Sequence, residues 1–119
     1  MIVLMKLSML MLGVENVEKS VAFYRDVVGL SSKGQVEQFA FLDAGEVTLV
    51  LSQPLGSSVP QRAGAMEAIF ASASVRKSRE ELHARGAHFV QEPHEVSPGS
   101  WAATFRDPDG HMLTLFGPE

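Results

Sequence analysis

Cysteine is absent from this sequence of 119 residues. Its absence excludes a disulfide framework, a thiolate metal site and a cysteine nucleophile. Basic residues are also few: 10 Lys and Arg stand against 14 Asp and Glu, which gives a net charge of -4. Clustered Lys and Arg supply most of the affinity for nucleic-acid phosphates, and the sequence contains no such cluster. The composition therefore predicts no nucleic-acid partner.

A long apolar run is missing as well. The nearest candidate, residues 1–12, is interrupted by Lys6 and is shorter than the roughly 20 apolar residues of a membrane-spanning helix. No small-residue cleavage site follows it, which argues against a secretory signal. We expect a buried β-strand there, at about Val3–Val14, in a cytoplasmic protein with no membrane partner.

The sequence does contain an internal repeat. Asn16–Ser20 (NVEKS) recurs as Ser74–Ser78 (SVRKS), and both segments place a good N-cap residue before a helical pattern. The pattern predicts helices at Val17–Val28 and Val75–Arg85. Each is followed by a glycine, which suits a left-handed C-terminal cap.

Strand pairs follow both predicted helices. Each pair is joined by a turn sequence and is typical of a hairpin; the four strands are Phe39–Leu42, Val47–Leu51, Trp101–Phe105 and Met112–Phe116. Another strand, at Glu67–Ala73, precedes the second helix. The order is therefore strand, helix and two or three strands, twice over, which favours the α+β class.

The repeat also predicts the domain organisation. Residues 1–119 would form a single domain, with module 1 at 1–53 and module 2 at 66–119. The intervening residues 54–65 are rich in Gly, Pro and Ser, which is typical of a linker. Neither module buries enough surface to be stable alone.

Two phrases of the chain resemble a known superfamily. Gly13–Leu30 resembles the opening of the vicinal-oxygen-chelate proteins, and Phe105–His111 (FRDPDGH) resembles a phrase near their end. This superfamily contains glyoxalase I, bleomycin-resistance proteins, fosfomycin-resistance enzymes and extradiol dioxygenases. The resemblance implies two βαβββ modules in tandem, forming a curled mixed sheet with a concave pocket, and a homodimer.

The resemblance also implies where a metal would bind. Family enzymes hold a divalent metal with His, Gln or Glu at positions that correspond here to Met9, Val50, Glu67 and Thr114. Only Glu67 is a good ligand, and metal sites normally need three or more. We therefore expect no metal and no cofactor; a divalent metal would enter only if the protein is an enzyme. His111 is expected to cap the preceding turn rather than to bind metal.

Strand alternation predicts which side chains share a face, because neighbouring residues point to opposite sides of a sheet. A four-residue loop at Asp107–Gly110 would set Phe105 opposite Met112. A loop at Ala44–Gly45 would set Phe41 opposite Thr48, and Phe39 opposite Val50. The aliphatic set expected against the helices is Leu10, Leu12, Ala40, Leu42, Leu49, Leu51, Leu113 and Leu115.

The other, concave face would be rich in aromatic residues and methionine. The ligand-binding residues expected there are Met9, Met11, Phe39, Phe41, Val50, Trp101, Phe105, Met112 and Thr114. Such side chains suit a flat, partly apolar small molecule. They would equally suit packing between the modules or against a second chain.

Glu67 is the one acidic residue expected on this face. A carboxylate among aromatic side chains suits catalysis as a general acid or base, so we take Glu67 as the candidate catalytic residue. It would equally bind a cationic group of a ligand, lie solvated at the mouth of the sheet, or pair with Arg62 or Arg106.

Two functions from different classes follow. The leading hypothesis is metal-independent binding of a small aromatic or antibiotic-like molecule, in the manner of bleomycin-resistance proteins. The alternative is a glyoxalase-type lyase or isomerase, or a dioxygenase, that uses a divalent metal. A third possibility is a structural or regulatory dimer with a filled cavity.

Overall fold

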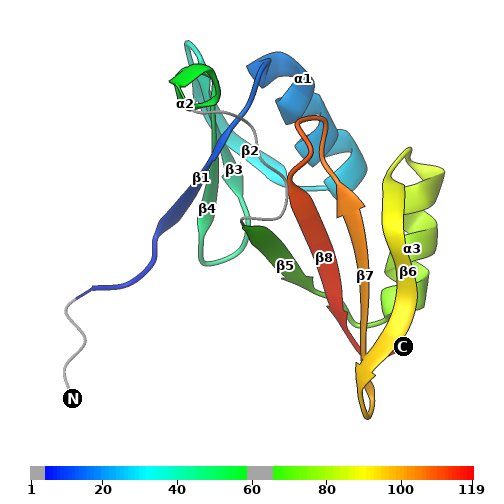
Figure 1. Cartoon of the computed structure of the whole chain (residues 1–119). Coiled ribbons are helices and arrows are strands. Elements are labelled where there is room, and N and C mark those ends of the chain that lie inside the picture. The colour runs from blue at the N-terminus through cyan, green and yellow to red at the C-terminus, as the bar shows by residue number, and fades with distance from the viewer. Residues whose placement is uncertain (1–4, 59–65) are drawn as a thin grey trace. The chain divides into compact units, whose positions relative to one another are not determined.

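The computed structural model of the chain describes residues 5–58 and 66–119. The chain divides into two compact units, Met1–Pro60 and Gln61–Glu119. Each unit holds one four-stranded mixed sheet that is not closed. The α+β class and the two tandem βαβββ modules are therefore confirmed (Figure 1). In the part of the chain that the structure describes, no helix is long and apolar enough to cross a membrane.

The first module follows the order strand, helix, three strands. Its elements are β1 (Met9–Gly13), α1 (Val17–Ala22), the π-helical turn η1 (Phe23–Val28), β2 (Ser31–Val36), β3 (Phe39–Asp43), β4 (Thr48–Ser52) and α2 (Gln53–Ser58). The strands lie in the order β1-β4-β3-β2. β1 runs parallel to β4, and the other neighbours are antiparallel.

The second module repeats this arrangement. Its elements are β5 (Glu67–Ala71), α3 (Val75–Ala84), β6 (His88–Ser97), β7 (Ser100–Arg106) and β8 (Met112–Gly117). The strands lie in the order β5-β8-β7-β6, with β5 parallel to β8. The same strand order and the same directions in both modules confirm the internal repeat.

The helix starts are capped as the sequence indicates. The Asn16 side chain accepts a hydrogen bond from the Lys19 N–H at 2.9 Å, and the Ser74 hydroxyl accepts one from the Lys77 N–H at 3.2 Å. The first predicted helix differs in its second half, which is a π-helix rather than an α-helix. The carbonyl of the fully buried Tyr24 accepts hydrogen bonds from the N–H groups of Gly29 and Leu30, which fixes this wider turn at its end.

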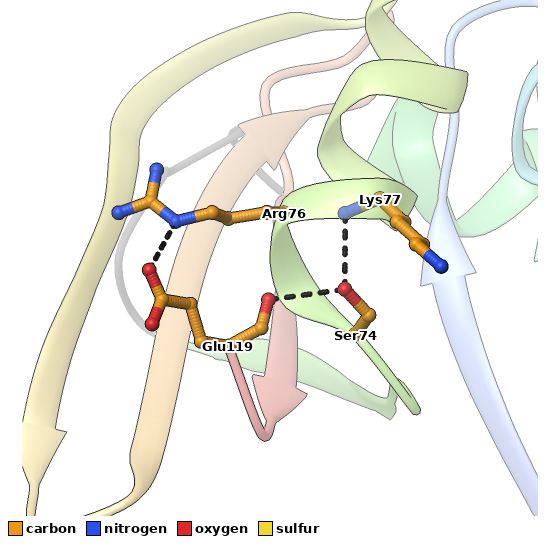
Figure 2. Close-up of polar contacts among 4 residues, drawn as sticks. All are labelled: Ser74, Arg76, Lys77 and Glu119. Atoms are coloured by element: carbon orange, nitrogen blue, oxygen red, sulfur yellow. Dashed lines mark hydrogen bonds and ion pairs between the residues drawn. The ribbon is translucent and has the colours of Figure 1, made fainter.

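The last two residues of the sequence complete the start of α3. The Pro118 carbonyl accepts a hydrogen bond from the Val75 N–H at 2.9 Å. The Glu119 carbonyl accepts hydrogen bonds from the Ser74 hydroxyl at 3.0 Å and from the Arg76 N–H at 2.8 Å. The Arg76 Nε also lies 2.5 Å from Glu119 Oε2. Figure 2 shows this contact together with the hydrogen bonds of Ser74. The first N–H groups of a helix have no partner within it, so these contacts tie the end of the chain to α3.

Each module has its own apolar core between helix and sheet. The side chains expected against the helices are buried, except for Leu10, which is half-buried. The helical segments bury Val17, Val21 and Tyr24 in the first module, and Val75 and Leu82 in the second. This part of the face prediction is confirmed.

The segment expected to be a linker begins with α2 instead of irregular chain. Gln53 Oε1 accepts a hydrogen bond from the Val17 N–H at 3.1 Å. Gly56 packs so closely on the end of β1 that a Cβ there would lie 2.2 Å from the Val14 carbonyl oxygen. Residues 59–65 of the expected linker, including Arg62, lie outside the described residues, as do residues 1–4 of the expected first strand.

Candidate functional site

The side of each sheet that faces away from its helix is called its open face below. On the first sheet, Met9 and Met11 of β1 lie beside Thr48 and Val50 of β4, while Phe41 of β3 lies opposite Val50. The open face of the first module therefore carries Met9, Met11, Phe39, Phe41, Thr48 and Val50. All five of the ligand-binding residues expected from the first module lie on this face.

The predicted register of this hairpin is nevertheless wrong by two residues. The loop is Ala44–Val47 rather than Ala44–Gly45, because Asp43 lies opposite Thr48 at the end of the pairing. Asp43 Oδ1 accepts a hydrogen bond from the Gly45 N–H at 2.9 Å, and Gly45 has a φ of 94°. A shift by an even number of residues keeps every side chain on its expected face, which is why the residue set survives the error.

The first open face is apolar and accessible at β1. Met9 is 54% and Met11 46% exposed, whereas Val50 is buried. Sequence reasoning missed one polar group here: Lys33, at a bulge of β2, donates a hydrogen bond from Nζ to Thr48 Oγ1 at 2.8 Å. A bulge leaves no signal in a period-two pattern, which explains the omission.

The predicted register of the second hairpin is wrong by one residue. Phe105 lies opposite Leu113 instead of Met112, and Trp101 lies opposite Gly117. A shift of one residue moves a whole strand to the other face. Trp101 and Phe105 therefore lie on the helix face, not on the open face with Met112 and Thr114.

Contacts on the helix face support this correction. Phe105 is fully buried, and its ring centroid lies 5.1 Å from that of Phe89. The Arg76 guanidinium of α3 lies over the Trp101 ring, with Cζ 4.9 Å from the ring centroid. Both aromatic side chains belong to the packing between α3 and the sheet.

The turn between β7 and β8 explains the shift. Asp107 Oδ1 accepts hydrogen bonds from the N–H groups of Asp109 and His111, and Asp107 Oδ2 lies 2.6 Å from His111 Nδ1. His111 is thus held in the turn, which extends the loop to five residues, Asp107–His111. The hydrogen bond to Asp107 raises the pKa of His111 above its usual value near 6.5, and partial burial of the ring opposes part of that shift.

The open face of the second module carries a row of polar side chains. Thr114 donates a hydrogen bond from Oγ1 to Glu67 Oε1. Thr104 Oγ1 lies 2.8 Å from Thr114 Oγ1 and 3.4 Å from Gln91 Oε1. The row therefore runs from β5 through β8 and β7 to β6, and we call Glu67, Thr114, Thr104 and Gln91 the polar row.

The polar row combines buried and accessible groups. Thr104 and Thr114 are 2% and 5% exposed, while Glu67 and Gln91 at the two ends are exposed. Ile69 and Phe116, both exposed, share the same face. Thr104 and Gln91 were not among the predicted site residues. The correct loop length would have placed Thr104 opposite Thr114 and revealed the pair.

The donor atoms present do not fit a divalent metal. The positions that correspond to metal ligands in the family carry a thioether and a hydrocarbon in the first module, and a carboxylate and a hydroxyl in the second. Among residues 5–58 and 66–119, no group of three or more His, Cys, Asp or Glu side chains is placed to hold a metal ion. Hard or borderline divalent ions need several oxygen or nitrogen ligands, and only Glu67 among these four positions supplies a strong one.

A hollow on the helix side of the second module is a different kind of surface. It is lined by Arg76, Arg79, Glu80, Glu92 and Pro93. Its charges compensate one another: the Arg79 guanidinium contacts both carboxylate oxygens of Glu92, at 2.9 and 3.1 Å. The open faces offer more apolar surface and are the better candidate site.

The chain belongs to the Glyoxalase/Bleomycin resistance protein/Dioxygenase superfamily, whose family model matches residues 6–115. An uncharacterized protein of Mycolicibacterium smegmatis is 29% identical over 114 residues, which cover 95% of this chain and 94% of that protein. The resemblance read from the sequence is thereby confirmed.

Solved structures show the same fold at low sequence identity. TnmS3, an antibiotic binding protein from a Streptomyces species, superposes with a TM-score of 0.81 at 21% identity and covers 100% of both chains. Lactoylglutathione lyase from Agrobacterium tumefaciens superposes with a TM-score of 0.76 at 22% identity, covering 93% of this chain and 92% of its own. One neighbour is a binding protein and the other an enzyme, so the fold alone decides neither function.

Proposed function

We propose that this protein binds a small, partly aromatic or antibiotic-like molecule without a metal. The observation that carries the proposal is the accessible apolar surface on the open faces, chiefly Met9 and Met11 in the first module and Ile69 and Phe116 in the second. Exposed apolar side chains that gather on one face mark a site for a ligand or partner. Methionine adapts its shape to irregular ligands.

Two further findings support the proposal. The donor atoms at the family's metal positions do not suit a divalent ion, which disfavours the metal-dependent enzymes of the family. TnmS3, which has the same fold over the full length of both chains, is an antibiotic binding protein. The proposal includes three points: a concave pocket of the kind expected from the family, a small-molecule ligand bound in it, and binding that needs no metal.

A thermal-shift screen tests the proposal. The panel contains aromatic antibiotics and aldehyde–thiol adducts, and we expect at least one antibiotic to raise the melting temperature of the wild type. Met11→Ser should weaken the shift. Val96→Ser is a matched control, because Val96 is 49% exposed against 46% for Met11 and lies outside the predicted site. Absence of any stabilisation across the panel would contradict the proposal.

Glu67 favours a second candidate, an enzyme of the glyoxalase type. The Thr114 hydroxyl holds its carboxylate on the open face, and a positioned carboxylate suits proton transfer. The aldehyde–thiol adducts in the same panel separate the two functions. Conversion of an adduct by the wild type and not by Glu67→Gln would support the enzyme and contradict the binding protein.

The assembly and location of the protein are also proposed. Small members of the family commonly form dimers, and the exposed open faces give a second chain apolar surface to cover. Size-exclusion chromatography with light scattering would report twice the chain mass for a homodimer, and the single-chain mass would contradict it. The cytoplasmic location stays a prediction from the sequence.

A further inference from the structure

The polar row contains one hydrogen bond more than its hydroxyl groups can donate. Its three contacts join Glu67 to Thr114, Thr114 to Thr104, and Thr104 to Gln91. Each threonine hydroxyl carries a single proton, so the two hydroxyls supply two of the three protons required. The third proton must come from one end of the row.

One proton arrangement keeps the Thr114 hydroxyl as the donor to Glu67. The Gln91 amide turns its NH₂ group to Thr104, Thr104 donates to Thr114, and Thr114 donates to the Glu67 carboxylate. An amide can present either its oxygen or its nitrogen at the same place. The hydrogen bond that Glu67 accepts and the orientation of Gln91 are therefore linked.

Glu67 has acceptor capacity left in this arrangement. Its Oε1 accepts from Thr114, while Oε2 has no hydrogen-bond or ion-pair partner among the described residues. On the open face, Glu67 lies level with Met112, and Arg106 follows on the next strand. Arg106 is two strand spacings away, roughly 10 Å, and forms no ion pair with Glu67 in the described part of the chain.

We propose that Glu67 recognises a cationic amidinium or ammonium group of the ligand, with Thr114, Thr104 and Gln91 as positioning residues. This inference rests on the proposed function and names the ligand class. The carboxylate takes the cationic group on Oε2, and the neighbouring Ile69 and Met112 contact the apolar body of the ligand. A charge-assisted hydrogen bond is roughly twice as strong as a neutral one, so a cation is the preferred ligand group.

Binding at Glu67 also has a consequence at the far side of the sheet. A cation on Oε2 polarises the carboxylate that accepts the hydrogen bond from Thr114, and this change passes along the row. The Gln91 NH₂ group then donates to Thr104. The backbones of Gln91 and Glu67 are three strand spacings apart, roughly 14 Å, but their side chains are joined through the two threonine hydroxyls. Loss of the Gln91 response in Thr104→Val therefore distinguishes transmission along the row from direct contact with the ligand.

Three aromatic probes of nearly the same shape test the proposal: benzamidine as its cation, benzamide as the neutral analogue, and benzoate as the anion. Each is titrated into ¹⁵N-labelled wild-type protein and followed by NMR. We expect benzamidine to bind roughly tenfold more tightly than benzamide or more, and benzoate to bind most weakly. The Gln91 side-chain amide signal should move with benzamidine.

Three variants separate recognition from positioning. Glu67→Gln should bring benzamidine down to the affinity of benzamide, whereas Glu80→Gln on α3 makes the same charge change on the helix side and should have no effect. Thr104→Val should remove the response of the Gln91 amide while benzamidine still binds. A purely structural Thr104 would leave that response in place.

The outcomes also separate this inference from the proposed function. Equal affinity for the three probes, or tightest binding of benzoate, would overturn the inference and leave small-molecule binding intact. No binding of any probe would overturn the inference as well, and the antibiotic panel would then decide the proposed function on its own. An unchanged Gln91 signal on benzamidine binding would contradict the role of the row.

Discussion

The two modules share one frame but carry different chemistry on their open faces. Strand order, strand direction and the hydrogen bond of the N-cap side chain are the same in both. At equivalent places in the registers, the first module has Met9, Phe41 and Val50 where the second has Glu67, Thr104 and Thr114. The shared strand order and helix packing therefore depend on the residues of the helix face. The residues of the open face can differ between the modules without changing this fold.

The largest expected effects test the shared frame. Leu42 and Phe105 hold equivalent core positions, opposite Leu49 and Leu113, and both are fully buried. Leu42→Ala should lower the free energy of unfolding by about 2–5 kcal/mol and Phe105→Ala by about 3–5 kcal/mol, through lost burial and the cavity left behind. Urea unfolding measures both. A loss of stability in only one of the two variants would show that the two core positions are not equivalent.

An exchange between the open faces should have an intermediate effect. Val50→Thr would bury a hydroxyl beside Met11 and Phe41, whose side chains offer no good acceptor, at a cost of about 1–3 kcal/mol. Thr114→Val leaves Thr104 with only the 3.4 Å contact to Gln91 and should cost about 1 kcal/mol. Urea unfolding of both variants checks that Val50→Thr is the more destabilising substitution. An unchanged free energy of unfolding in Val50→Thr would show that the open face of the first module tolerates a polar group.

The smallest expected effect distinguishes the two hairpin turns. The pKa of His111 is raised in the folded state by its hydrogen bond to Asp107, so the folded state holds the proton more tightly than the unfolded state. This stabilisation is fully present below about pH 6.5 and is lost as pH rises through the raised pKa. Urea unfolding across this range should show the loss in the wild type but not in His111→Asn.

The turn of the first module is the control for this pH dependence. Asp43 accepts its hydrogen bond from the Gly45 N–H and has no histidine partner there. Asp43→Asn should therefore leave the pH dependence above pH 6.5 unchanged. Equal pH dependence in the wild type and in His111→Asn would show that the Asp107–His111 pair does not contribute.

The same two turns show how far the sequence predicts the site. Apolar periodicity and the capping residues Asn16 and Ser74 predict the modules correctly, because these signals act over a few neighbouring residues. Loop length depends on side-chain hydrogen bonds such as those of Asp107 to His111, which no apolar pattern records. A register error of two residues left Phe41 on its predicted face. A register error of one residue instead placed Phe105 on the face opposite to the predicted one.

The expected site residues therefore divide by strand: those of β7 lie on the helix face, and the others lie on the open faces. Met9, Met11 and Phe39 are placed on the open face as expected, while Trp101 joins Phe105 in the packing against α3. Thr104 and Gln91 emerge only from the register that the structure shows. Whether these residues bind a ligand stays a prediction that the variants above test.

The central claim, metal-independent binding, is tested most directly by one titration. Calorimetry with the strongest ligand from the thermal-shift panel compares protein dialysed against a chelator with protein supplied with Zn²⁺, Ni²⁺ or Mn²⁺. Of the side chains at Met9, Val50, Glu67 and Thr114, only Glu67 is a good metal ligand, so we expect the same dissociation constant in every sample. Binding that disappears with the chelator and returns with one of these metals would contradict the account.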